Sequence, residues 1–119
     1  MNKILIADDA SFMRLMITQI LARKDLRNTI EAEDGRQAVE RFKSDHPDLT
    51  LMDITMPELN GLDALKEILE INPLAKVIIC SAVANESMVV EALKLGAVDF
   101  LAKPFRPDEL IRTVQKHLT

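Results

Sequence analysis

Five short apolar runs alternate with five longer stretches of helical periodicity along this chain, and this alternation most constrains its fold. The runs are Lys3–Ala7, Asn28–Ala32, Leu49–Met52, Lys76–Cys80 and Asp99–Ala102. Strands that are apolar on both faces are typical of a parallel sheet covered by helices on either side. The run Asn28–Ala32 alternates and is the least apolar, so we expect it at an edge of the sheet.

The stretches between these runs have the spacing of amphipathic helices with one buried face. Their apolar positions are Met13, Met16, Ile17, Ile20 and Leu21; Ala38, Val39 and Phe42; Leu62, Leu65, Ile68 and Leu69; and Leu110, Ile111, Val114 and Leu118. We expect the second helix to begin with a capping box at Asp34 and Gln37, and the third to begin after Asn60-Gly61. We expect the fourth helix to run from Glu86 to Leu95 and stop at Gly96, and the fifth to start at Pro107. Five β–α repeats predict an α/β domain with a doubly wound parallel sheet.

Composition excludes several classes of protein. The chain has 119 residues, enough for one domain, and its net charge of −4 and pI near 5.1 argue against a nucleic-acid partner. Its single cysteine, Cys80, rules out an internal disulfide and a cysteine-based zinc site, and we interpret it as a small core residue. Neither a signal peptide nor a membrane-length apolar run is present, so we expect a small soluble domain of the cytoplasm without membrane contact.

Polar side chains follow four of the five predicted strands. They are Asp8 and Asp9 after the first, Asp53 after the third, Ser81 after the fourth, and Lys103 with Pro104 after the fifth. Parallel strands end at a common edge, where ligands bind in such folds. We therefore expect three carboxylates, one hydroxyl and one ammonium group to converge there.

Each of these residues also has a purely structural interpretation. Asp8 or Asp9 can favour the start of a helix near Ser11, and Asp53 can cap a turn. Ser81 can be a satisfied hydroxyl, and Lys103 an exposed strand end. Taken together these interpretations weaken, because three crowded carboxylates repel and raise one another's pKa. A hard divalent cation held by oxygen atoms, such as Mg²⁺, is the natural complement.

The chemistry that remains for such a site is phosphoryl transfer to a carboxylate. His46 and His117 are expected at solvated surface positions, so no Ser–His pairing is predicted, and the glycines at 35, 61 and 96 are too isolated for a phosphate loop. A carboxylate nucleophile can accept a phosphoryl group. Mg²⁺ and Lys103 would neutralise its oxygens, and Ser81 would donate a hydrogen bond.

These residues, in this order, resemble the receiver domains of bacterial two-component response regulators. The resemblance spans essentially the whole chain and rests on Asp8-Asp9, on DITMPELNG from Asp53 to Gly61, on Ser81-Ala82, and on Lys103-Pro104-Phe105. It implies a flavodoxin-like sheet of five strands in the order 2-1-3-4-5 with five helices. It also implies that residues 1–119 form one receiver domain with no output domain.

The resemblance further assigns a role to each site residue. It implies that Asp53 is the phosphoacceptor and that Lys103, followed by a cis Lys103–Pro104 peptide, pairs with the phosphoryl group. Asp8, Asp9 and Asp53 would surround Mg²⁺, with Asp9 a direct ligand and Thr55 a ligand through its backbone carbonyl. Ser81 would be the switch hydroxyl and Phe100 the aromatic switch residue. Ser81 and Phe100 stand where Thr and Tyr are commoner in the family. Thr55 and Val83 flank the site at positions that can govern access of water to the phosphoryl group.

The implied function is a signalling switch rather than an enzyme, since it would catalyse only its own phosphorylation and dephosphorylation. The expected partners of the monomer are a histidine kinase, a target such as the flagellar motor switch, and a phosphatase. The motifs DDASFMR and DITMPE, with the stretch from Cys80 to Phe105, look most like chemotaxis regulators of the CheY type. The alternatives are a stand-alone phosphorelay receiver, a Mg²⁺-dependent phosphatase with an aspartyl nucleophile, and a flavodoxin-like electron carrier.

Two surfaces carry more apolar residues than one buried face needs. Phe12 and Leu15 lie off the buried stripe of the first helix, either as scattered exposed residues or as a docking patch beside the acid pair. In the fourth helix the excess comes from Met88, Val89, Val90, Ala92 and Leu93. We expect an output surface there, with Ser81 drawn toward the phosphoryl group and Phe100 entering the vacated space.

Overall fold

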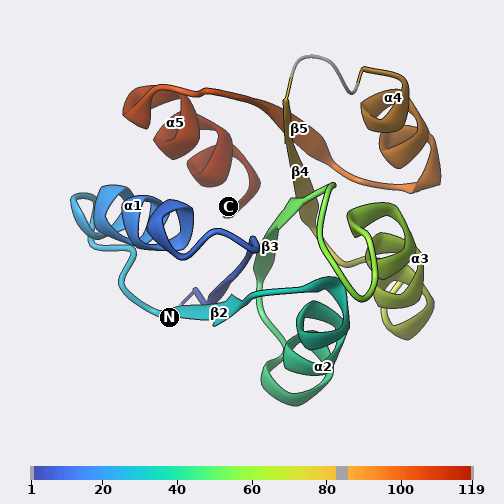
Figure 1. The fold of residues 1–119 in the computed structure, drawn as a ribbon. Helices are drawn as coiled ribbons and strands as arrows, with labels where there is room; N and C mark the ends of the chain where they lie inside the picture. The colour runs from blue at the N-terminus through green and yellow to red at the C-terminus, as the bar shows by residue number, and fades with distance from the viewer. Residues whose placement is uncertain (1, 83–85, 119) are drawn as a thin grey trace.

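The computed structural model describes residues 2–82 and 86–118, which form one parallel sheet with helices on both faces. The strands are β1 (Ile4–Ala7), β2 (Thr29–Ala32), β3 (Leu49–Asp53), β4 (Val77–Ala82) and β5 (Asp99–Lys103). The helices are α1 (Ser11–Ala22), α2 (Gly35–Asp45), α3 (Gly61–Ile71), α4 (Glu86–Leu95) and α5 (Pro107–Leu118). The strand order is β2-β1-β3-β4-β5 (Figure 1). The predicted fold class and the edge position of the second strand are both confirmed.

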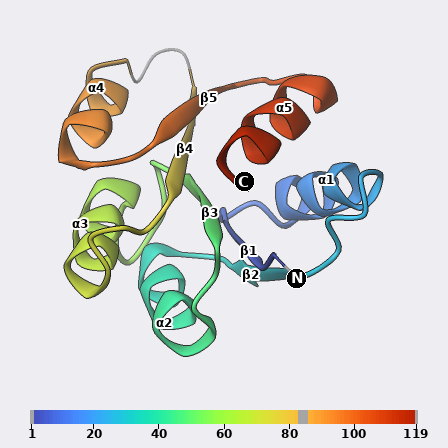
Figure 2. The same ribbon diagram turned by 180° about the vertical axis from the view of Figure 1, so that it is seen from behind.

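Two helical layers enclose the sheet. α1 and α5 cover one face, and α2, α3 and α4 cover the other (Figures 1 and 2). In β1, Ile4 and Ile6 pack toward α1 and α5, whereas Leu5 and Ala7 pack toward the opposite layer. Successive side chains of a strand point to opposite faces. This strand is therefore apolar throughout because it is buried on both sides.

The helix boundaries follow the predicted signals closely. Asp34 caps α2 by accepting a 2.7 Å hydrogen bond from the Gln37 N–H, and Asn60 caps α3 in the same way. The return bond of the capping box differs from the expected one, because Gln37 Oε1 accepts from the N–H of Glu33, one residue before the cap. Gly96, with φ of 127°, follows the end of α4 in a backbone conformation that favours glycine.

Two predictions about burial are wrong. Met16 is exposed rather than part of the buried stripe of α1, whose buried residues are Ile17, Ile20 and Leu21. α1 shares one face of the sheet with α5, so a buried stripe narrower than predicted is enough to cover its part of that face (Figure 1). His117 is largely buried, because its ring bonds to Asp99 at 2.9 Å across the start of β5, whereas His46 is exposed as predicted.

None of the helices within the described ranges has the length and apolar character needed to cross a membrane. Cys80 is buried in the core on the α1 and α5 side, as predicted, and burial raises the pKa of its thiol to about 12. A thiol with so high a pKa stays protonated and unreactive at neutral pH. The Lys103–Pro104 peptide is cis, as the family resemblance implies.

Candidate functional site

The carboxyl edge of the sheet brings three carboxylates together. Asp8 directly follows β1, Asp53 ends the neighbouring β3, and the register pairs Ala7 with Met52 one position earlier. Asp9 reaches the same point from the connection to α1. Carboxylate oxygens of Asp8, Asp9 and Asp53 all lie within 4.8 Å of one another.

Lys103, the last residue of β5, reaches across to this group. Its Nζ lies 2.8 Å from Asp8 Oδ2, to which it donates a hydrogen bond, and 3.5 Å from Asp53 Oδ2. The lysine side chain is 20% exposed and that of Asp8 only 3%. One ammonium group therefore pairs with the two less exposed carboxylates of a cluster of three.

The pKa values reflect this excess of negative charge. Burial raises the pKa of Asp53, and the charges of Asp8 and Asp9 add to the increase. The charge of Lys103 and a 3.4 Å hydrogen bond from the Thr55 N–H act in the opposite direction without cancelling it. Burial alone would lower the pKa of Lys103, but its hydrogen bond to Asp8 and the charge of Asp53 raise it. The cluster is therefore short of positive charge.

The donor set suits a hard cation. All three clustered side chains offer carboxylate oxygen, and oxygen donors select Mg²⁺ or a similar ion. The polar contacts of the cluster fix Asp8 and Asp53, whereas Asp9 is exposed and keeps its carboxylate available for a ligand. The three residues thus combine two carboxylates held by polar contacts with one exposed carboxylate, an arrangement that could hold an ion.

The start of α3 closes tightly against the end of β3. The Gly61 N–H donates a 2.7 Å hydrogen bond to the carbonyl of Ile54, and a Cβ on Gly61 would lie 2.4 Å from the Asp53 carbonyl oxygen. Only glycine permits this approach, which holds the loop that carries Thr55 beside the cluster. The start of α3 is therefore closely packed against the end of β3.

Ser81 and Phe100, the two predicted switch residues, lie on β4 and β5 and form no hydrogen bond with the carboxylate cluster among the described residues. The buried Ser81 hydroxyl donates to the Ala82 carbonyl at 3.2 Å, and Phe100 is 45% exposed. Both residues line a cavity of about 310 Å³ between α4 and β5, together with the apolar residues Val89, Val90 and Leu93. Val83 lies outside the described residues.

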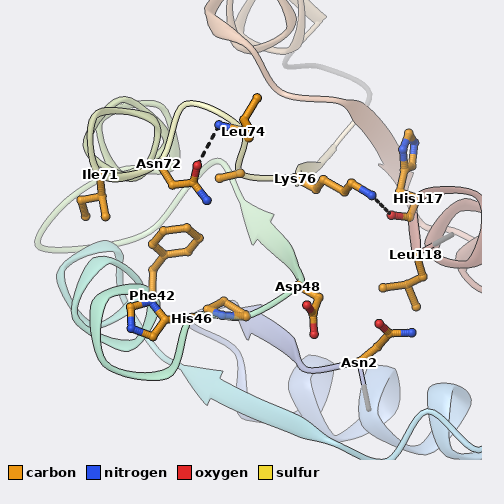
Figure 3. A pocket seen from close by; sticks show the side chains of 12 residues that line it. Asn2, Phe42, His46, Asp48, Ile71, Asn72, Leu74, Lys76, His117 and Leu118 are labelled. Atoms are coloured by element: carbon orange, nitrogen blue, oxygen red, sulfur yellow. Dashed lines mark hydrogen bonds between the residues drawn. The ribbon is translucent and has the colours of Figure 1, made fainter.

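A larger cavity, of about 470 Å³, lies at the opposite, amino edge of the sheet (Figure 3). The Lys76 ammonium group spans part of it and donates a 2.8 Å hydrogen bond to the His117 carbonyl at the end of α5. Asp48, also at this cavity, accepts from the backbone N–H of Lys3 at 2.7 Å. Both charged groups form hydrogen bonds to nearby backbone groups, and the carboxylate cluster lies at the opposite edge of the sheet.

Sequence reasoning missed one residue of the carboxyl edge, Arg14. Its Nη1 donates a 2.7 Å hydrogen bond to the Asp8 carbonyl oxygen. The available signal was its place in the sequence, five residues after Asp9 and next to the apolar position Met13 of the buried stripe. A charged residue so close to a buried face needs a partner, because burying an unpaired charge is costly.

A comparison with known protein families identifies the family of this chain. The family model described as the response regulator receiver domain matches residues 4–115. The chain belongs to this receiver domain family. Two relatives match this chain over nearly its whole length. The chemotaxis protein CheY of Thermotoga maritima is 49% identical over 97% of this chain and 96% of its own length. The chemotaxis protein CheY of Bacillus subtilis is 50% identical over 98% of both.

Solved structures give the same result for the receiver domain. The receiver domain of NtrX from Brucella abortus superposes with a TM-score of 0.91 at 32% identity, over 97% of each chain. The domain is therefore a receiver of the CheY type in both sequence and fold, and it belongs to two-component signalling.

Proposed function

We propose that this protein is a phosphorylation-activated switch of two-component signalling that accepts a phosphoryl group on Asp53. The observation that carries the proposal is the cluster of Asp8, Asp9 and Asp53 with Lys103 bonded across it. A carboxylate with a raised pKa beside a lysine and an ion-binding group suits transfer of a highly charged phosphoryl group.

In the proposed reaction a carboxylate oxygen of Asp53 attacks the phosphorus of a phosphohistidine on the kinase. The new O–P bond forms as the P–N bond breaks, and the departing imidazole takes up a proton. Lys103 neutralises one phosphoryl oxygen after leaving Asp8, which lies only 2.8 Å away. Mg²⁺ held by Asp8, Asp9, Asp53 and the Thr55 carbonyl would supply charge neutralisation when bound.

The cavity between α4 and β5 supports the proposed response to phosphorylation. Ser81 lines it from β4, and Phe100 stands at its border, half exposed. Its volume of about 310 Å³ exceeds the roughly 150 Å³ that accommodates a benzene ring in a protein core. We expect Ser81 to turn toward the phosphoryl group and Phe100 to move inward, which changes the surface that a target contacts.

The relatives favour chemotaxis as the setting over a stand-alone phosphorelay, because two that match nearly the whole chain are named chemotaxis proteins. In that setting the partners are a cytoplasmic histidine kinase and a target such as the flagellar motor switch. Phe12 and Leu15, 71% and 58% exposed beside the acid pair, would provide the apolar contact for the kinase.

The decisive experiment is incubation of the protein with acetyl phosphate and Mg²⁺, followed by intact mass spectrometry. We expect wild type to gain the mass of one phosphoryl group, and Asp53→Asn to gain none, because an amide oxygen is a far weaker nucleophile than a carboxylate. Omitting Mg²⁺ should greatly reduce the gain.

Asp63→Asn is the matched control, since Asp63 is an exposed carboxylate on α3 paired loosely with Lys66 at 3.9 Å. It should be phosphorylated like wild type. Equal phosphorylation of Asp53→Asn and wild type would refute Asp53 as the acceptor, and no mass gain in wild type would refute the proposed function itself.

A further inference from the structure

Arg14 joins three elements at the carboxyl edge although the proposed reaction does not use it. The side chain leaves α1 and is only 13% exposed. Nη1 donates to the Asp8 carbonyl oxygen at 2.7 Å, and Nε donates to Glu31 Oε1 on β2 at 2.8 Å. A planar guanidinium that bonds two acceptors in this way fixes their relative positions better than a lysine can.

Every hydrogen-bonding group of Asp8 has a partner. Its N–H donates to the Ala32 carbonyl, its Oδ1 accepts from the Ala10 N–H, and its Oδ2 accepts from Lys103. The carbonyl oxygen is the group that Arg14 holds. Because the peptide bond is planar, fixing this oxygen also fixes the N–H and Cα of the next residue, Asp9.

Asp9 depends on this constraint more than its neighbours in the cluster do. Its side chain is exposed, while the polar contacts of the cluster fix Asp8 and Asp53. The backbone therefore determines where the Asp9 side chain starts relative to the cluster. The peptide plane that Arg14 orients is the one that leads into Asp9.

The charge of Arg14 and its hydrogen-bond geometry have opposite effects on the affinity of the cluster for a cation. A cation beside the cluster repels a second cation, so a purely electrostatic view predicts that removing Arg14 strengthens ion binding. Glu31 offsets that charge through its 2.8 Å ion pair with Arg14 Nε. Geometry and charge thus predict opposite signs for the same substitution.

We propose that Arg14 is a positioning residue for the cation site, which orients the Asp8–Asp9 peptide while Glu31 neutralises its charge. The inference rests on the proposed function only in requiring that the cluster binds Mg²⁺. Partners that orient metal ligands typically contribute about 10–100-fold to metal affinity. We place Arg14 at the lower end, because it acts through the backbone.

The test is isothermal titration calorimetry of the full chain with MgCl₂, without a phosphoryl donor and well below the unfolding temperature. Arg14→Lys keeps the charge and most of the stem, and Arg14→Met removes the charge. We expect Arg14→Lys to weaken Mg²⁺ binding about tenfold, and Arg14→Met to weaken it less, because the loss of a positive charge partly offsets the loss of geometry. Glu31→Gln, which leaves the bond to Asp8 intact, should weaken it less than threefold, roughly the effect of one partly screened charge.

Arg36→Met is the matched control, because Arg36 forms an ordinary exposed pair with Glu67 at 3.2 Å on α2 and α3. Its Mg²⁺ affinity should equal that of wild type. Unchanged affinity in folded Arg14→Lys, or tighter binding in Arg14→Met, would overturn the inference. A wild type that fails to bind Mg²⁺ would instead count against the proposed function. Melting curves identify any variant that does not fold, and Arg14→Lys, as the milder change, then decides the matter alone.

Discussion

Asp53 and Asp99 lie at opposite edges of one sheet, and their pKa values are displaced in opposite directions. At the carboxyl edge, burial and the neighbouring acids raise the pKa of Asp53. At the amino edge, burial of Asp99 also opposes ionisation, but hydrogen bonds from His117 and the Phe100 N–H, with the charges of His117 and Lys116, outweigh it and lower the pKa. The ionised form of aspartate is thus disfavoured at the carboxyl edge and favoured at the amino edge.

The difference separates an edge whose charges are paired from an edge whose charges are only partly paired. At the amino edge, lysines satisfy the carbonyls at helix ends: Lys3 Nζ donates to Asp45 at the end of α2, and Lys76 Nζ to His117 at the end of α5. Cations favour these positions, because helix C-termini carry partial negative charge. At the carboxyl edge the charges remain unbalanced, and such local imbalance is typical of a functional site.

The largest expected effect comes from removing one lysine at each edge. Lys103→Met leaves the buried carboxylate of Asp8 without its cation, and we expect a loss of about 2–4 kcal/mol in the free energy of unfolding. Lys76→Met removes a hydrogen bond to a carbonyl and should cost about 1 kcal/mol. Urea unfolding in EDTA measures both. Equal losses at the two edges would contradict the comparison.

Replacing the two aspartates should have smaller effects of opposite sign at pH 7. Asp53→Asn should raise the free energy of unfolding, because a raised pKa means that folding disfavours the ionised form. Asp99→Asn should lower it by about 0.5–1 kcal/mol, since this pair is partly exposed.

The pH dependence separates the two effects further. The gain in Asp53→Asn should shrink as the pH falls from 7 toward the ordinary carboxyl pKa of 3.8 and disappear below it, where the wild-type carboxyl is protonated in both the folded and the unfolded state. The deficit in Asp99→Asn should persist to lower pH and disappear only as the pH falls through the lowered pKa of Asp99. Urea unfolding between pH 7 and pH 4, without Mg²⁺, should show the gain in Asp53→Asn shrinking while the deficit in Asp99→Asn stays nearly constant. Parallel profiles would show that the two edges do not differ.

The alternation of strands and helices and the meeting of the site residues at one edge follow from local sequence patterns, whereas the strand order is implied only by the family resemblance. Strand ends in a parallel sheet share one edge, so residues at Asp8, Asp53 and Lys103 must approach each other once the strands are recognised. The bonds of Arg14 and His117 escaped prediction. Each depends on a partner distant in sequence, Glu31 and Asp99 respectively, and on the packing of a helix across a strand.

The imbalance at the carboxyl edge implies that a divalent cation should stabilise the folded protein. The direct measurement is thermal unfolding of wild type and Asp9→Asn, each with MgCl₂ and with NaCl at matched ionic strength. We predict that Mg²⁺ at 100 times its dissociation constant stabilises wild type by about 2.7 kcal/mol and that Asp9→Asn loses most of this gain. Unfolding of wild type that is the same in both salts would contradict the account.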